Sequence, residues 1–209
     1  MLESEIRVRS RAIRTGILLV VVGSVLIGGM SALAASKGAL SVAPLYTENV
    51  PKEGLPTVYG LPLAWTNAEL FATWYDTLRL TATEAEILGA ALAPLTAPCC
   101  DDNPLARCCC ERGGLVCNVV RTARGLGAYL VQAGYAPEAV TAAMEQWLRF
   151  IHGDYYVARA LADQGVDPRA YGLFQPGNGA CYRGLCTAPL QEGGCGGMGH
   201  EVIVERPRI

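Results

Sequence analysis

An uncharged apolar segment near the N-terminus constrains the fold of this chain more than any other feature. No charged residue occurs between positions 15 and 36, and the centre of this segment is almost wholly apolar. About 20 such residues in a helix cross the roughly 30 Å hydrocarbon core of a bilayer. The segment therefore predicts either a transmembrane anchor that is retained or a signal peptide that is removed.

The charges before this segment predict its orientation. Arg7, Arg9, Arg11 and Arg14 precede it, and positively charged flanks stay on the cytoplasmic side of a membrane. A signal peptidase would use the small residues of Ala32-Leu33-Ala34. The apolar run is longer than a common signal-peptide core, which favours the retained anchor. We expect a single-pass protein of the cell membrane with its C-terminal domain outside, or a secreted or periplasmic protein if cleavage occurs.

Composition separates the remaining chain into a linker and a domain. Prolines and glycines are frequent up to residue 62, whereas apolar residues at helical spacing follow. The predicted parts are a cytoplasmic basic segment (1–14), the signal anchor or signal peptide (15–36), a linker (37–62), a cysteine-rich helical domain (63–200) and a tail (201–209). The chain is 51% hydrophobic, which allows a packed core, and its net charge of −2 argues against nucleic acid as a partner.

The domain is predicted to be mainly α. Thr66 with Glu69 and Thr81 with Glu84 have the spacing of capping boxes at two helix starts. Apolar spacing predicts further helices over 116–132, from Pro137 onward and over 155–164, with Gly134 and Gly165 as stops. No strand pattern of any length occurs outside 202–204. The expected fold class is thus a small helical domain with two cysteine-rich loops, behind a transmembrane or signal-anchor helix and a proline-rich linker.

Nine cysteines fall in two clusters of the part predicted to lie outside the membrane. The first contains Cys99, Cys100, Cys108, Cys109, Cys110 and Cys117, and the second contains Cys181, Cys186 and Cys195. Disulfides are the default in an oxidising compartment, and an odd number leaves one thiol over. Adjacent cysteines bridge each other only with strain, so their dense spacing suits metal ligation as well as disulfide formation.

Two features favour metal ligation. Cys117 is expected in the first turn of a helix, where the helix dipole lowers the pKa of a thiol. Met198 and His200 follow Cys195 within a glycine-rich loop, and these side chains are soft ligands. The predicted cofactor is a Cu(I) or Zn(II) ion, and the candidate ligands are the nine cysteines with Met198 and His200.

Several polar residues near the clusters have simpler interpretations. His152 and Asp154 suggest acid–base chemistry, but a boundary between two helices explains them better. Asp101 and Asp102 are either hard co-ligands or solvated loop acids. Four arginines either lower the thiol pKa values or form a solvated helix face; they are Arg107, Arg112, Arg121 and Arg124.

The arrangement of the first cluster resembles that of the bacterial PCYCGC-motif exported proteins and lipoproteins. There a helix leads into a proline and a cysteine cluster, and a further cysteine enters the next helix. Here Pro98-Cys99-Cys100, the triplet at 108–110 and Cys117 follow the same order, within a likeness over about residues 66–150. Residues 101–107 separate the cysteines, unlike the family pattern. The resemblance implies a metal-binding or redox role outside the membrane.

The sequence leaves three functions open. The leading hypothesis is a non-enzymatic, membrane-tethered protein that binds a soft metal ion or transfers it to a metal- or electron-transfer protein partner. The first alternative is a thiol–disulfide redox protein that uses the adjacent cysteines. The second is a disulfide-stapled structural subunit of an envelope complex.

Overall fold

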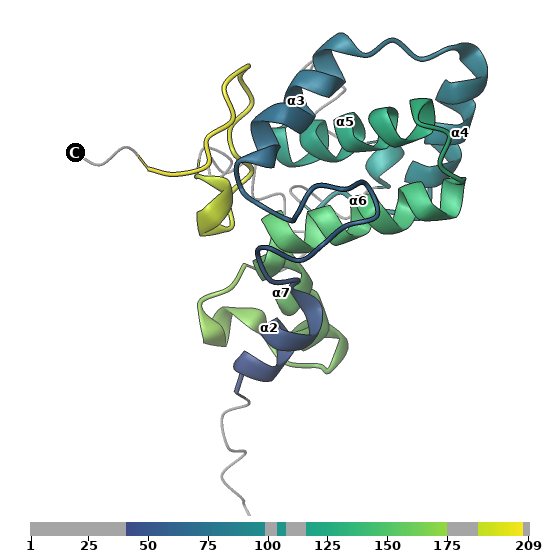
Figure 1. Ribbon diagram of the computed structural model, residues 1–209. Helices are drawn as coiled ribbons and strands as arrows, with labels where there is room; N and C mark the ends of the chain where they lie inside the picture. Colours follow the sequence, from purple (N-terminus) through teal and green to yellow (C-terminus); the bar gives the residue numbers. More distant parts are fainter. Residues whose placement is uncertain (1–40, 99–103, 108–115, 175–187, 207–209) are drawn as a thin grey trace, which may run out of the picture. The chain divides into compact units, whose positions relative to one another are not determined.

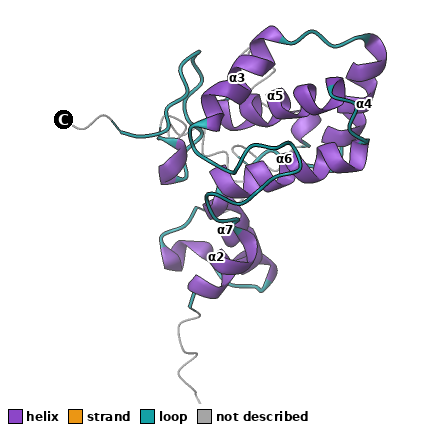
Figure 2. Cartoon of the chain, in the orientation of Figure 1, coloured by secondary structure: helices purple, strands orange, loops and turns teal. Residues whose placement is uncertain are grey.

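The computed structural model describes residues 41–98, 104–107, 116–174 and 188–206. Within these ranges the protein is mainly helical and has no strand, which confirms the predicted α class (Figure 2). One isolated bridge pairs Thr96 with Pro104. The α-helices are α2 (Ala43–Asn49), α3 (Asn67–Thr77), α4 (Ala82–Leu92), α5 (Asn118–Gln132), α6 (Pro137–Ile151) and α7 (Gly153–Asp163), with short 3-10 turns η1 (Leu105–Arg107), η3 (Pro168–Tyr171) and η6 (Leu190–Glu192).

Helices α5 and α6 form an antiparallel hairpin at the centre of the described unit (Figure 1). Gly134 ends α5 with a φ of 81°, and the amide of Tyr135 donates to the carbonyl of Leu130. This is the glycine C-cap that the sequence predicts. Buried Trp147 on α6 donates from its indole to the hydroxyl of Thr122 on α5, over 2.9 Å. That bond fixes how the two helices are aligned.

A glycine lets α3 cross α5 at close range. A Cβ at Gly125 would lie 1.8 Å from the carbonyl oxygen of Phe71 on α3, so no larger residue fits without displacing a helix. Helix α4 packs against both α5 and α6. The three helices around α5 explain why nearly all of its residues are buried.

The two predicted capping boxes have different outcomes. Thr81 and Glu84 make both reciprocal hydrogen bonds at the start of α4, as predicted. Thr66 makes no side-chain cap, and its backbone is already helical. The start of α3 is held instead by Asn67, whose side-chain amide donates to the carbonyl of Pro62 over 2.7 Å.

The compact unit begins earlier than the predicted domain and includes part of the predicted tail. It starts at Val42, so the segment 37–62 is not simply an extended linker. It contains α2, which packs against α7 (Figure 1), and the buried Tyr59. On the other side, Ile203 of the predicted tail exchanges backbone hydrogen bonds with Leu190 and Gly196 at 2.9 and 3.0 Å.

None of the helices in the described part of the chain is long and apolar enough to cross a bilayer. The predicted anchor at 15–36 lies outside the described residues.

Candidate functional site

The structure describes four of the predicted ligands: Cys117, Cys195, Met198 and His200. The others lie outside the described residues, namely Cys99, Cys100, Cys108, Cys109, Cys110, Cys181 and Cys186. Asp101, Asp102 and Arg112 also lie outside them. The described four come from one end of α5 and from the segment after η6.

The segment that carries Cys195 closes onto the first turn of α5. Cys117 is the N-cap of this helix and is fully buried. The amide of Asn118 donates to the carbonyl of Gly197 at 2.9 Å, and the amide of Val119 donates to the carbonyl of Cys195 at 3.1 Å. Helix N-termini have amide groups without partners in the helix, and this loop satisfies two of them. This loop therefore folds back onto α5.

The backbone on both sides of Cys195 is closely packed, which explains the glycines that flank this residue. A Cβ at Gly194 would lie 2.1 Å from the carbonyl oxygen of Ala188, so the backbone passes there only because the residue has no side chain. Cys195 is 2% exposed, and its thiol donates weakly to the carbonyl of Gly197 over 3.8 Å. The backbone around Cys195 is therefore closely packed and buried.

Arg121 anchors the end of the same segment. One of its terminal nitrogens donates to the carbonyls of Gly199 and His200 at 3.1 and 2.9 Å, and its guanidinium forms an ion pair with Asp76 at the end of α3. Arg121 is only 7% exposed. It therefore holds the C-terminal segment and does not form part of a solvated helix face, which corrects that alternative.

Asn118 completes this anchor from inside the protein. Its side-chain amide donates to the carbonyls of Gly196 and Glu201 at 2.7 and 3.0 Å, and its oxygen accepts from Arg121 at 3.1 Å. The side chain is fully buried. Residues 196–201 are thus held by side chains and not by regular secondary structure. Asn118 and Arg121 donate to their carbonyls, and Asp76 pairs with Arg121. No sequence motif marks them, because their partners are about 80 residues away along the chain.

Met198 and His200 line the same pocket but differ in burial. Both line a pocket of about 260 Å³ with Val116, which directly precedes Cys117, and with Tyr75, Asp76, Arg121 and Gly199. Met198 packs against the hydrophobic core, whereas His200 is exposed. Of the two predicted imidazole and thioether ligands, the methionine therefore packs against the core and the histidine does not.

The other histidine of the chain, His152, is more buried than its place between two helices predicts. His152 is the C-cap of α6 and the N-cap of α7, as expected for a helix boundary, but it is only 9% exposed. Its ring makes hydrogen-bonding contacts with the backbone of Pro98 and Gly194. Pro98 directly precedes Cys99, and Gly194 directly precedes Cys195. The imidazole therefore lies between the two segments that lead into the cysteine clusters.

Burial controls the charge of this imidazole. Desolvation lowers the pKa of His152 to about 4, although the carboxylate of Asp154 and the two backbone contacts act in the opposite direction. The ring is therefore neutral at neutral pH and keeps a lone pair on one nitrogen. Its Nδ1 atom is buried and has no hydrogen-bond partner among the described residues.

The described side chains do not form a metal site by themselves. Within the described ranges, no three histidine, cysteine, aspartate or glutamate side chains are grouped so that they could hold an ion. A site here therefore needs further ligands, and the cysteines outside the described ranges are the candidates that the sequence offers.

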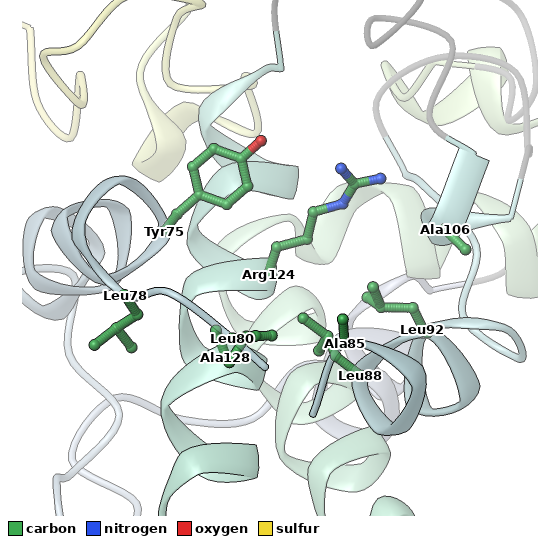
Figure 3. Close-up of a pocket in the computed structure, with 10 residues that line it drawn as sticks. Tyr75, Leu78, Leu80, Ala85, Leu88, Leu92, Ala106, Arg124 and Ala128 are labelled. Atoms are coloured by element: carbon green, nitrogen blue, oxygen red, sulfur yellow. The ribbon is translucent and has the colours of Figure 1, made fainter. Parts of the chain in front are cut away.

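A second pocket, of about 450 Å³, lies among α3, α4 and α5. Figure 3 shows the polar ends of Tyr75 and Arg124 on one side of this pocket and leucine side chains on the other. Arg124 is 8% exposed and donates to the carbonyl of Leu105 in η1 over 2.9 Å. Arg124 thus fixes η1 against α5, and it too is not part of a solvated helix face.

No protein-family model, curated protein or solved structure matches this chain, so the resemblance to the PCYCGC-motif proteins stays a prediction.

Proposed function

We propose that this protein binds a soft metal ion, Cu(I) or Zn(II), through cysteine thiolates at the end of the α5–α6 hairpin. The place of Cys117, Cys195 and the residue before Cys99 at this end of the hairpin supports the proposal. Pro98 and Gly194 contact His152, Cys117 caps α5, and the carbonyl of Cys195 accepts from Val119. Pro98, Cys117 and Cys195, which are far apart in the sequence, thus lie near the same end of the hairpin.

The local electrostatics favour thiolates there. The N-terminal end of a helix carries partial positive charge, which stabilises an anion such as a cysteine thiolate. Cys117 stands at this end of α5, and the buried Arg121 follows one turn later. Thiolate, thioether and neutral imidazole are ligands of Cu(I) and Zn(II), whereas Mg²⁺ and Ca²⁺ prefer oxygen.

The burial of Cys117 and Cys195 favours tight binding over rapid transfer. Their exposed fractions are 0% and 2%, so an incoming partner does not reach their sulfur atoms without a rearrangement. We propose that these two cysteines hold the ion together with Cys110, and that any transfer to a metal- or electron-transfer partner uses other cysteines of the clusters.

We further propose that the domain is tethered outside the cytoplasm by the apolar segment at 15–36. The four arginines that precede this segment support that orientation. A tag placed after Ile209 would be digested by protease added to intact spheroplasts. Protection of the tag until the membrane is dissolved would reverse the topology.

Metal titration of the full chain in detergent, reduced under anaerobic conditions, tests the proposed binding. Cys117→Ser and Cys110→Ser should each remove most of the bound metal, because loss of one thiolate opens a closed site. The control is Ser41→Ala, which lies at the edge of the compact unit and changes no candidate ligand. Unchanged metal stoichiometry in both cysteine variants would refute the assignment.

A disulfide-stapled structural protein is the second candidate, and the same burial supports it. Buried sulfur atoms in an oxidising compartment are typical of structural disulfides, which resist reduction. In that case, the protein purified in air contains disulfides and no metal, and the cysteine variants lower its stability without changing metal content.

A further inference from the structure

The pocket of about 450 Å³ among α3, α4 and α5 has one apolar side and one polar side. Its volume is typical of small-molecule sites, which occupy about 300–1,000 Å³. Leu78, Leu80 and Leu88 line the pocket and are only half-buried. Apolar side chains that gather around a hollow, instead of joining the core, indicate a place where an apolar group binds.

The positions of two glycines explain why this hollow exists. A Cβ at Gly127 of α5 would lie 2.7 Å from the Cδ1 atom of Leu88, so the absence of a side chain there lets Leu88 pack directly against α5. A Cβ at Gly89, which lines the pocket on α4, would meet nothing within 4 Å. The leucine is thus held in place while the space beside Gly89 stays open.

Arg124 provides the polar side together with Tyr75. Figure 3 shows the guanidinium of Arg124 and the hydroxyl of Tyr75 at the same side of the pocket, away from the leucines. Arg124 is 8% exposed, and one of its terminal nitrogens donates to the carbonyl of Leu105, which fixes the orientation of the side chain. A guanidinium carries several N–H donors in a planar fork, so one group can bind a carbonyl and a carboxylate together.

The charge of the pocket selects the class of ligand. Among the described residues that line it, Arg124 is the only one with a charged side chain. A single cation in a largely buried setting attracts one negative charge more strongly than it would in open water. An apolar chain with one carboxylate therefore matches both sides of the pocket.

We propose that this pocket binds a small amphipathic monocarboxylate, such as a fatty acid of medium chain length. The guanidinium of Arg124 and the hydroxyl of Tyr75 bind the carboxylate, and the leucines of α4 and of the α3–α4 connection contact the alkyl chain. This site is independent of the proposed metal site, because none of the candidate metal ligands lines the described part of the pocket.

Photolabelling of the full chain in detergent tests this site. The probe is a decanoate with a diazirine at the end of its chain, and mass spectrometry locates the labelled residues. We expect the label around Leu80 and Leu88, and an excess of decanoate should remove it. In Arg124→Met the probe concentration that gives half-maximal labelling should rise at least about 10-fold, because a hydrogen bond to a charged group contributes enough free energy for such a change.

Two further variants control for effects on folding and on the detergent. Arg169→Met removes an exposed arginine that does not line the pocket, so it should be labelled like the wild type. Ala85→Phe changes an exposed residue of α4 that does line the pocket. Its ring should fill the space and prevent labelling, while Arg124 stays in place. Detergent takes up the probe equally in every sample, so differences between variants report on the pocket.

The outcomes separate the pocket from its ligand class. Labelling elsewhere in the chain, or labelling of the pocket that neither Arg124→Met nor Ala85→Phe changes, would overturn the proposal. Labelling that is lost in Ala85→Phe but unchanged in Arg124→Met would refute the carboxylate. Should Arg124→Met fail to fold, the corresponding decanol probe decides on the wild type. Equal labelling of the pocket by both probes, relative to their uptake into detergent, would refute a site for carboxylates.

Discussion

The carbonyl oxygen of Cys195 accepts a hydrogen bond of 3.1 Å from the amide of Val119 in the first turn of α5. This bond places Cys195 of the second cluster against the helix that begins just after Cys117, the last residue of the first cluster. The C-terminal segment and the start of α5 are therefore held together.

The C-terminal segment should depend on Arg121. In Arg121→Met the carbonyls of Gly199 and His200 and the carboxylate of Asp76 lose their shared partner. Hydrogen bonds that involve a charged group contribute about 1.5–3 kcal/mol, so the free energy of unfolding should fall by about this amount. Urea denaturation measures the loss, and hydrogen exchange should show faster exchange around Ile203.

The matched control for this variant is Arg169→Met. Arg169 is paired only with Asp167 on the surface, where both side chains are largely exposed. Its removal should change stability by less than about 1 kcal/mol. Equal losses in both arginine variants would contradict the anchoring role of Arg121.

The crossing of α3 and α5 should tolerate no side chain at Gly125. Gly125→Ala places a Cβ against the carbonyl of Phe71, and overpacking of this kind costs at least about 1–3 kcal/mol. At exposed Gly89 on α4, an added Cβ meets nothing within 4 Å, so Gly89→Ala should stabilise the protein by about 0.5–1 kcal/mol. Thermal unfolding of both variants compares them, and a destabilised Gly89→Ala would contradict the packing described here.

The stability of the metal-free protein should fall as the pH drops from about 6.5 toward 4. In the unfolded chain His152 takes up a proton near its ordinary pKa of 6.5, whereas in the folded protein burial delays protonation to about pH 4. The unfolded state therefore binds more protons in this window, and the total loss is about 3 kcal/mol. Urea denaturation in the presence of a chelator, at several pH values, measures this dependence.

His152→Gln should lose this part of the pH dependence, while His200→Gln should keep it. Exposed His200 has no comparable burial. A pH profile that is the same in the wild type and in His152→Gln would show that His152 is not buried as a neutral ring.

Local signals in the sequence predict much of this fold. The apolar spacing of α5 and α6, the stop at Gly134 and the capping box at Thr81 each depend on neighbouring residues, and each is confirmed. Helix α2 was not predicted, because it has only seven residues and packs against α7, which is distant in sequence. Helices this short owe their stability to tertiary contacts more than to their own sequence.

The candidate site was harder to predict for the same reason. An arginine on a helix usually faces solvent, and only the return of residues 196–201 to α5 makes Arg121 a buried anchor. A histidine between two helices gives no sign that its ring will be buried between Pro98 and Gly194. Sequence clustering indicates which cysteines are candidates, but long-range contacts determine where the ring of His152 lies.

The metal content and free-thiol count of the same aerobically purified full chain test the central claim most directly. If the cysteines bind a soft metal ion, the protein should contain about one or more copper or zinc ions per chain, and denaturation with a chelator should release many reactive thiols. The contrary result is a protein without metal and with about one free thiol, as expected when nine cysteines pair as far as they can. That result would show that the cysteines of both clusters cross-link the domain through disulfides and bind no metal.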